Sequence, residues 1–330
     1  MKRILLVRLS AMGDLCQSLG AVQALQSEQP DLELHFVTQT SNVPLLEGLG
    51  FASVIALDRY GGRRARRDVR RAMRSLQADL AIDLQGNWKS ALITRASGAV
   101  RCVGAAGSHR QAPASGLLLE RIAIEGPRHP AHVATSLLRE LLGLKVTSTP
   151  TSPQPQLCAT GAELAGLDGR LTRLGIEPDR PFDVLVVARH DDNRAWPREY
   201  MERQTDRTHG SVLWLLGPAE ADEPLPAGAI ALVQRADETR DLVALGRRVA
   251  LSGGRVFGPD VGTTHVMAAC GAETYAFFGP QDPERTAPPG AFIVVRSDPP
   301  SCVPCQSRRC TNPAGPICME FDASDAHRIR

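Results

Sequence analysis

Short apolar runs, separated by polar segments that often contain glycine, recur along the chain. The first of them, Ile4–Val7, is uniformly apolar, as a parallel strand buried on both faces is expected to be. Similar runs predict strands at residues 32–38, 54–57, 79–86 (ending in a loop), 182–187, 212–216, 230–233 and 274–278. Strands that alternate with helical segments indicate a doubly wound α/β fold.

Segments with helical spacing separate many of these runs. They predict helices at residues 15–26, 42–49, 117–122, 133–142, 159–174 and 241–246, and helices that begin near Trp88, after Trp196-Pro197 and at Thr263-Thr264. Apart from residues 117–122, the stretch from Arg101 to Gly126 has no clear period and is expected to be irregular.

A stretch rich in Pro, Ser and Thr interrupts the pattern between Lys145 and Leu157. It has too few apolar residues to pack a core, so it is interpreted as an interdomain linker. The chain of 330 residues is also long for one hydrophobic core. We therefore expect two domains, residues 1–150 and 151–330.

Composition narrows the class of protein. Hydrophobic residues make up 43% and charged residues 22%, as in an ordinary globular protein, and a net charge of +2 gives no reason to expect nucleic acid as a partner. The amino-terminal apolar run is too short for a signal peptide, and no window is apolar enough for a membrane span. The sequence thus predicts a cytoplasmic protein with reduced cysteines.

The stretch from Val256 to Gly290 carries the strongest chemical signal. A strand end is followed by Gly258-Pro259-Asp260-Val261-Gly262 and a short helix, and the strand at 274–278 ends in a second turn. The free N–H groups and the dipole at the start of a helix both favour phosphate. The alternative is that these are ordinary loops between helices and strands.

A second signal follows the first strand, where Arg8 to Asp14 reads RLSAMGD. The strand, loop and helix suit a nucleotide-binding fold, but the G-x-G-x-x-G fingerprint is absent, which argues against a nicotinamide enzyme. A carboxylate in this loop could take a proton from an attacking hydroxyl. The alternative is that Asp14 caps the helix.

Together these motifs resemble one known family. Asp260-x-Gly262-x-x-His265, followed by F-G-P-x-D-P-x-R-T at residues 278–286, is similar to the donor-site signature of glycosyltransferase family 9, the heptosyltransferases of lipopolysaccharide synthesis. The R-x-S-x-x-G-D loop, the D-x-x-x-D-x-Q-G segment at residues 79–86 and Arg194 in a K-x-W-P-like element extend the resemblance from Ile4 to about Met319.

The resemblance implies a GT-B fold, two Rossmann-like doubly wound domains that face a central cleft. Residues 1–150 would bind the acceptor, and residues 151–330, which include a cysteine-rich tail, would bind the nucleotide sugar. It implies an inverting, metal-independent transfer of heptose from ADP-heptose to a lipopolysaccharide inner-core acceptor, either Kdo or heptose on lipid A. Two alternatives remain: a transferase of this fold with another nucleotide sugar or acceptor, and a non-catalytic, metal-stabilised binding protein.

Residue roles follow from the same resemblance. Asp14 is expected to be the catalytic residue. The expected donor-binding residues are Arg194, Glu220, Asp260, Gly262, Thr263 and His265. The expected acceptor-binding residues are Ser10, Gly13, Gln17, Arg63, Arg64 and Arg67.

The chain departs from the family pattern at three of its motifs. Gln17-Ser18-Leu19-Gly20 stands where many relatives have histidine followed by threonine-leucine-proline, and Gln17 cannot titrate. Arg194 replaces a lysine, which keeps the charge but changes the geometry. Val261 replaces a threonine and removes one side-chain hydrogen bond. These departures bear on acceptor and donor identity more than on reaction type.

The densest basic run lies between Arg59 and Arg74. It is either a solvated helix face or a docking surface for an anionic acceptor or phospholipid. The implied partners are a nucleotide-sugar donor, an anionic glycolipid acceptor and, peripherally, the inner face of the cytoplasmic membrane. The protein is expected to be monomeric.

The tail contains Cys302-x2-Cys305-x4-Cys310-x7-Cys318. Four closely spaced thiols can bind structural zinc, but a loop with free thiols fits this sequence equally well, and we expect no metal or cofactor. Structural roles are expected for Asp83 and for Trp196.

Overall fold

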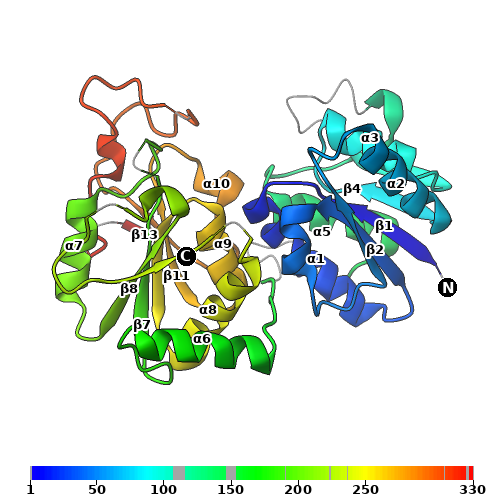
Figure 1. The fold of residues 1–330 in the computed structure, drawn as a ribbon. Coiled ribbons are helices and arrows are strands. Elements are labelled where there is room, and N and C mark those ends of the chain that lie inside the picture. Colours follow the sequence, from blue (N-terminus) through cyan, green and yellow to red (C-terminus); the bar gives the residue numbers. More distant parts are fainter. Residues whose placement is uncertain are drawn as a thin grey trace. The chain divides into compact units, whose positions relative to one another are not determined.

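The computed structural model describes residues 2–106, 116–145, 154–189, 191–222, 224–235, 237–307, 309–324 and 327–329. The chain divides into two compact units, unit 1 (Met1–Pro155) and unit 2 (Gln156–Arg330), which Figure 1 shows as separate α/β bodies. Most of the expected linker, residues 146–153, lies outside the described part of the chain.

Unit 1 contains a parallel sheet of six strands in the order β3-β2-β1-β4-β5-β6. Its strands are β1 (Arg3–Val7), β2 (Glu33–Gln39), β3 (Ser53–Leu57), β4 (Leu80–Asp83), β5 (Arg101–Ala106) and β6 (Glu120–Ala123). Its helices are α1 (Met12–Glu28), the 3-10 helix η1 (Thr40–Leu46), α2 (Gly62–Ser75), α3 (Trp88–Ala96) and α5 (Pro130–Leu142). Helix α1 contacts α5, and α2 contacts α3.

Unit 2 contains a sheet of seven strands in the order β13-β12-β11-β10-β7-β8-β9, in which only β13 is antiparallel. Its strands are β7 (Phe182–Val186), β8 (Ser211–Leu216), β9 (Ile230–Val233), β10 (Arg255–Pro259), β11 (Glu273–Phe278), β12 (Phe292–Val295) and β13 (His327–Ile329). Its helices are α6 (Gly161–Arg173), α7 (Arg198–Arg207), η2 (Pro218–Glu220), α8 (Thr239–Ser252), α9 (Gly262–Ala269), α10 (Pro283–Thr286) and η3 (Ile317–Met319).

Aromatic packing dominates one face of the unit 2 sheet. The ring of Trp196 lies 4.4 Å from that of Phe277, and the Trp196 indole N–H donates a hydrogen bond of 2.9 Å to the main-chain oxygen of Phe321. Tyr275 stacks between Phe257 and Phe292, at 5.0 and 4.9 Å. These contacts confirm the structural role expected for Trp196, and Pro197 precedes α7 as expected.

The apolar runs are strands as predicted. The central ones are buried on both faces, whereas those in the edge strands β3 and β9 are only partly buried. All four residues of Ile4–Val7 are 0% exposed. The expectation of irregular structure was wrong for residues 101–106 and 120–123, which form β5 and β6. Of the helix expected at 117–122, residues 117 and 118 are helical, whereas residues 120–122 are strand. β5 is rich in small residues, and β6 is a charged edge strand whose Glu120 pairs with Arg101 at 2.6 Å, so neither has a strong apolar pattern.

Other elements also differ from expectation. The predicted helix at 42–49 is the 3-10 helix η1, which contains Pro44. Strands β12, which follows Gly290, and β13, near the end of the chain, were not predicted. Among the described residues, no helix is long and apolar enough to cross a membrane.

Gly254 marks the closest approach between elements of unit 2. A Cβ atom at this position would lie 2.0 Å from the main-chain oxygen of Phe182 in β7. We expect Gly254→Ala to push β10 away from β7 and to cost roughly 3 kcal/mol of unfolding free energy. Thermal unfolding followed by the fluorescence of the buried Trp196 and Trp214 measures this loss.

Gly166, inside α6, is the matched control, because a Cβ atom there has no neighbour within 4 Å. Gly166→Ala should stabilise the unit by roughly 0.5–1 kcal/mol, since alanine restricts the unfolded chain. Equal effects of the two substitutions would contradict the close approach at Gly254.

A partly buried ion pair joins α6 to α8. Arg240 donates to both carboxylate oxygens of Glu163, at 2.7 and 2.6 Å, and the two side chains are only 18% and 25% exposed. These hydrogen bonds are the main reason that the pKa of Glu163 falls from 4.5 to about 2. The pair's contribution to stability is therefore complete above the unfolded value of 4.5 and disappears as pH falls toward about 2.

We expect Arg240→Gln to cost roughly 2 kcal/mol at neutral pH, and the loss to shrink as the pH falls below the unfolded pKa of Glu163. Urea unfolding of both proteins at a series of pH values measures it. Arg180→Gln is the control, because its pair with Glu177 is 76% and 72% exposed and should contribute little. If Arg240→Gln lowered the free energy of unfolding by the same amount at every pH, Arg240 would not be the cause of the lowered pKa of Glu163.

Candidate active site

Both sheets have a switch point at their centre. In unit 1 the chain builds outward from β1 to β2 and β3 and then returns to β4 on the other side of β1; in unit 2 the same happens at β7 and β10. In open α/β sheets, ligands bind beyond the carboxyl ends of the strands at such a point. The loops after β1 and β4, and those after β7 and β10, are thus the candidate sites.

In unit 2, Arg194 connects the two loops at the switch point. Its guanidinium donates to both carboxylate oxygens of Asp192, at 2.8 and 2.5 Å, and its Nη1 donates to the main-chain oxygen of Asp260 at 2.6 Å. The hydrogen bonds from Arg194 lower the pKa of Asp192, and the same bonds raise the pKa of Arg194. The side chain of Arg194 is still 32% exposed, so its charge can reach a ligand.

Asp260 anchors the loop after β10. Its carboxylate lies 2.8 Å from Nε2 of His265 and accepts a hydrogen bond of 3.1 Å from the hydroxyl of Thr286. Asp260 and His265 are both buried, and Thr286 belongs to α10, which follows β11. The Asp260 carboxylate therefore connects the first turn of α9 with the end of α10.

The amino terminus of α9 faces the same loop. Its N-cap residue Val261 is extended and provides no side-chain cap, so ligand oxygens can take that place. A Cβ atom at Gly258 would lie 2.5 Å from the Thr264 hydroxyl and 2.8 Å from Cβ of Val186. Glycine at this position thus lets α9 begin close to β7 and β10.

Glu220 ends η2, which follows β8, the strand beside β7. The residue is 3% exposed, and its Oε1 has no hydrogen-bond partner in the described part of the chain. Burying a polar atom without a partner costs free energy, so it suggests a missing ligand group. No described hydrogen bond or ion pair joins Glu220 to Arg194 or Asp260.

In unit 1, Gln85 holds the two loops of the switch point together. Its Oε1 accepts hydrogen bonds from the main-chain N–H groups of Leu9 and Ser10, at 2.7 and 3.2 Å. Asp83 stabilises the turn that contains Gln85. Its carboxylate accepts hydrogen bonds from the main-chain N–H groups of Gln85 and Gly86, at 2.9 and 3.0 Å.

Asp83 is a structural carboxylate, as expected. It also accepts a hydrogen bond of 2.9 Å from the hydroxyl of Ser90 in α3. Burial raises the pKa of Asp83, while its hydrogen bonds act in the opposite direction. The residue is 1% exposed and cannot contact a substrate directly.

Asp14 lies in the first turn of α1 and forms an ion pair of 2.7 Å with Arg8. The N-cap of α1 is Ala11, so Asp14 does not cap the helix. The Arg8 side chain is 5% exposed and that of Asp14 is 36% exposed. Arg8 also donates to the main-chain oxygen of Leu84, so it ties Asp14 to the loop after β4.

The expected acceptor residues divide into two groups. Ser10 lies beside Gln85 in the loop before Asp14, whereas Gly13 and Gln17 are buried in α1, and Gln17 is 1% exposed. The other group consists of exposed residues in the first turns of α2: Arg63, Arg64 and Arg67. Helix α2 follows β3, two strands from β1, and no described ion pair joins it to Asp14. The roles of all these residues stay predictions.

Four residues with a clear place in these sites were not among the predicted site residues. They are Arg8, Gln85, Asp192 and Thr286. The sequence motifs quoted above contain three of them: Arg8, Gln85 and Thr286. Asp192 carried no signal beyond its position two residues before Arg194.

The cysteines of the tail do not form a metal centre in this structure. Cys302, Cys305 and Cys310 are exposed and Cys318 is buried, and no group of three or more potential ligands is placed to hold a metal among the described residues. Burial is the main reason that the pKa of the Cys318 thiol rises to about 11.

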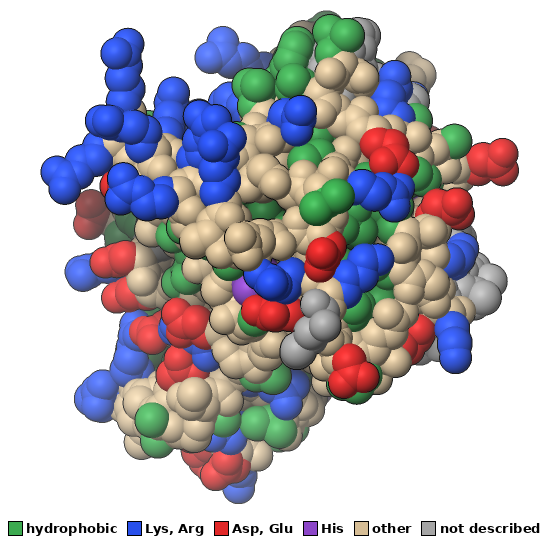
Figure 2. Space-filling model, turned by 90° about the vertical axis from the view of Figure 1, so that its right-hand side faces the viewer, with side chains coloured by type: hydrophobic (Ala, Val, Ile, Leu, Met, Phe, Trp, Pro, Cys, Tyr) green, Lys and Arg blue, Asp and Glu red, His purple; other side chains and the backbone are tan. Residues whose placement is uncertain are grey.

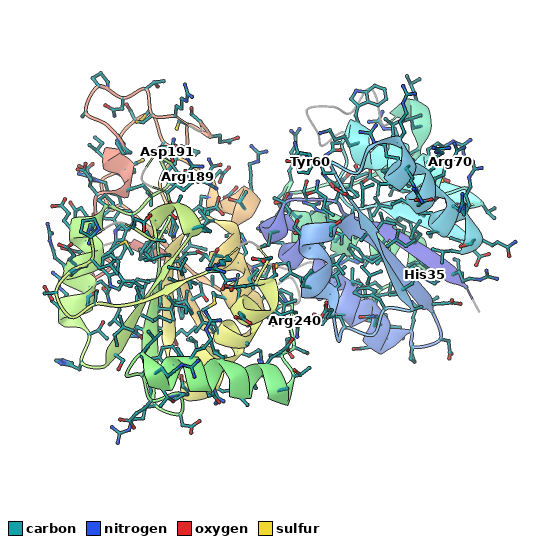
Figure 3. The ribbon with its side chains drawn as sticks, in the orientation of Figure 1. His35, Tyr60, Arg70, Arg189, Asp191 and Arg240 are labelled. Atoms are coloured by element: carbon teal, nitrogen blue, oxygen red, sulfur yellow. The ribbon has the colours of Figure 1, made fainter. Side chains whose placement is uncertain are left out.

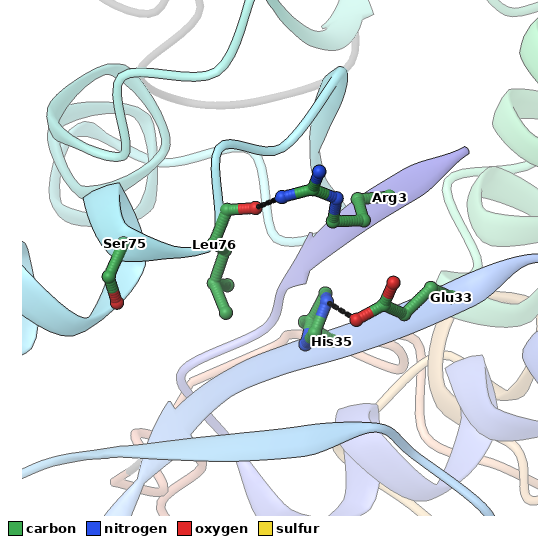
Figure 4. Close-up of a pocket in the computed structure, with 5 residues that line it drawn as sticks. All are labelled: Arg3, Glu33, His35, Ser75 and Leu76. Atoms are coloured by element: carbon green, nitrogen blue, oxygen red, sulfur yellow. Dashed lines mark hydrogen bonds and ion pairs between the residues drawn. The ribbon is translucent and has the colours of Figure 1, made fainter. Parts of the chain in front are cut away.

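A cavity of about 390 Å³ lies at the opposite edge of the unit 1 sheet, where β1 and β2 begin (Figure 4). Its lining residues are Arg3, Glu33, His35, Ser75 and Leu76. Nδ1 of His35 lies 2.8 Å from the Ser53 hydroxyl and Nε2 lies 3.2 Å from Glu33, while burial lowers the pKa of His35. Because it lies at the amino ends of the strands, this cavity is separate from the switch-point site of unit 1.

Comparison with known proteins places these sites in context. The family model "Glycosyltransferase family 9 (heptosyltransferase)" matches residues 66–314. Lipopolysaccharide heptosyltransferase 1 of Pseudomonas aeruginosa is 25% identical over 326 residues, which cover 94% of this chain and 87% of that protein.

Solved structures show the same fold. A family 9 glycosyltransferase from Veillonella parvula has a TM-score of 0.74 at 18% identity, with 88% of this chain and 86% of that one covered. Heptosyltransferase WaaC of E. coli, solved with ADP, has a TM-score of 0.67 at 22% identity, with 88% and 92% covered. The matches confirm the predicted GT-B type of fold, with two Rossmann-like doubly wound domains.

We expect Glu220→Gln to leave the stability unchanged or to raise it by roughly 1 kcal/mol, because the amide removes a buried charge with an unpartnered oxygen. Thermal unfolding at neutral pH measures the change, with Glu202→Gln on the surface of α7 as the control. A loss of more than about 1 kcal/mol would indicate that the carboxylate stabilises the fold rather than being kept for a ligand.

Proposed function

The chain belongs to glycosyltransferase family 9, and we propose that it transfers a heptose from ADP-heptose to an inner-core acceptor of lipopolysaccharide, with inversion at the anomeric carbon. One observation carries the proposal: Arg194 connects the loops after β7 and β10 beside the uncapped start of α9. A cation and free N–H groups at a switch point suit a diphosphate. A WaaC structure that contains ADP-2-deoxy-2-fluoro heptose supports the choice of donor.

In this proposal unit 2 binds the donor. Arg194 and the N–H groups of Gly262 and Thr263 contact the diphosphate and stabilise the charge that grows on it as the sugar leaves. Asp260 and His265 orient the sugar hydroxyls or the phosphate. Glu220 accepts hydrogen bonds from the ribose hydroxyls, which would satisfy its unpartnered oxygen.

Unit 1 provides the acceptor side of the reaction. Asp14 takes the proton of the acceptor hydroxyl as that oxygen forms a bond to the anomeric carbon. The bond between this carbon and the β-phosphate oxygen breaks, and ADP leaves with the electron pair. A single displacement of this kind inverts the anomeric configuration.

The remaining acceptor contacts follow from charge and position. Ser10 lies in the loop before Asp14, while Gly13 and Gln17 shape the buried start of α1. The exposed Arg63, Arg64 and Arg67 would bind the phosphates and keto-acid sugars of an acceptor built on lipid A. Such an acceptor places the enzyme on the inner face of the cytoplasmic membrane as a peripheral protein.

Two substitutions separate the proposed roles. Arg194→Ala should weaken ADP binding by roughly 10- to 100-fold, because it removes charge-assisted hydrogen bonds to the diphosphate. Asp14→Asn should leave ADP affinity unchanged and lower kcat by roughly 10²- to 10⁴-fold, because it removes the base. Calorimetry with ADP and a transfer assay with ADP-heptose measure the two effects.

The controls are matched in position. Arg189 lies in the same loop as Arg194 but forms an exposed pair with Asp191, and both residues are labelled in Figure 3. Arg189→Ala should therefore have little effect on ADP binding. Asp31→Asn changes an exposed carboxylate beyond the end of α1. Undiminished transfer by Asp14→Asn, or unchanged ADP affinity in Arg194→Ala, would refute the corresponding assignment.

A further inference from the structure

Helices α2 and α3 form one continuous outer surface of unit 1. They pack side by side on the same face of the sheet, where Val69 and Met73 of α2 and Ile93 of α3 join one hydrophobic cluster (Figure 1). Nε of Arg74 reaches across to the main-chain oxygen of Ala96 at 3.4 Å. The outer sides of both helices are thus presented together.

This surface, which we call the α2–α3 surface, is strongly cationic. The two helices carry nine cations, all exposed, against the single carboxylate of Asp68: Arg63, Arg64, Arg66, Arg67, Arg70, Arg71, Arg74, Lys89 and Arg95. The Asp68 carboxylate lies 4.0 Å from Arg71 and compensates little of this charge. Figure 2 shows Lys and Arg side chains gathered in one region at its upper left, and Arg70 projects from α2 in Figure 3.

Large apolar side chains accompany the cations. Trp88 and Leu92 lie one turn apart on α3 and are 43% and 52% exposed. Tyr60, just before α2, is 88% exposed, with the Arg59 guanidinium 5.7 Å from its ring centre. Single exposed apolar residues are ordinary, but aromatic and aliphatic side chains among clustered cations are typical of surfaces that enter a bilayer interface.

The topology places this surface beside the acceptor loop. All strands of the sheet are parallel, so α1, α2 and α3 each begin at its carboxyl edge. Tyr60 and Trp88 therefore lie at the same edge as Asp14, which is in the first turn of α1. A membrane bound there would bring lipid-linked acceptors to the edge that carries Asp14.

We propose that the α2–α3 surface docks unit 1 on a bilayer of anionic phospholipids, with the arginines on the headgroups and Trp88, Leu92 and Tyr60 in the interface. Each basic residue near such a membrane strengthens binding several-fold. Leu92 favours a lipid surface over a nucleic acid, because bases stack on aromatic rings but offer no hydrocarbon chain to an aliphatic side chain. The inference deepens the proposed function, since it names the surface that delivers the acceptor.

Trp88 provides a direct optical test. It is the exposed tryptophan, whereas Trp196 and Trp214 are buried in unit 2 at 5% and 2%. Vesicles that contain phosphatidylglycerol and brominated phosphatidylcholine should quench the Trp88 emission, and vesicles without the anionic lipid should quench it far less. Trp88→Phe should abolish the quenching. Absence of quenching in the wild-type protein would overturn the proposal.

A pair of matched triple variants tests the charge and the apolar contact. Arg70→Gln, Arg71→Gln and Leu92→Ser together should weaken co-sedimentation with anionic vesicles by roughly 30-fold or more, since two cations and an apolar anchor are lost. Arg173→Gln, Arg180→Gln and Leu174→Ser make the same changes at exposed residues of unit 2 and should leave binding unchanged. Equal weakening by both variants would contradict the assigned surface.

Two further measurements distinguish a failure of the membrane-docking proposal from a failure of the proposed transferase function. Vesicle binding is measured without donor or acceptor, so its failure would leave the proposed transfer intact. Transfer to a water-soluble, deacylated acceptor should be equal in the α2–α3 variant and the wild type, whereas transfer to the acceptor in vesicles should fall. Tighter binding of the wild type to a short DNA duplex than to anionic vesicles would also overturn the proposal.

Discussion

Each sheet places the first strand of its unit at the centre, and this constraint determines where both candidate sites lie. The chain builds outward on one side of β1 or β7 and returns on the other, so the loops after the two central strands diverge. Main-chain N–H and C=O groups in these two loops then need hydrogen-bond partners, which a side chain from the opposite loop can provide. Gln85 fills this role in unit 1 and Arg194 fills it in unit 2.

The two units use the same geometry for different chemistry. In unit 1 a neutral amide joins the loops, and the charged pair of Arg8 and Asp14 leaves a partly exposed carboxylate at the edge. In unit 2 a guanidinium joins the loops beside the start of α9, and the site favours anions. The proposed transfer from a sugar diphosphate to a hydroxyl would use the carboxylate of unit 1 as the proton acceptor and the anion site of unit 2 for the diphosphate.

Whether the sequence predicts a feature of the fold or the sites depends on how far apart in the chain the contacting residues lie. Buried parallel strands such as β1 are visible as continuous apolar runs, and short motifs contain Asp14 and Arg194. β5 was missed because its residues are mostly small, and β6 was missed because a charged edge strand has no apolar period. The contact of Arg194 with Asp260 joins residues 66 positions apart, and those of Gln85 span 75 and 76, so they follow from the topology alone.

A crystal structure of the protein with bound ADP-heptose tests the central claim most directly. We predict the diphosphate at the carboxyl edge of the unit 2 sheet, within hydrogen-bond distance of the Arg194 guanidinium and of the N–H groups of Gly262 and Thr263. The ribose is expected beside Glu220. A diphosphate bound at the amino ends of the strands, or to unit 1 with Arg194 still free of ligand, would contradict it.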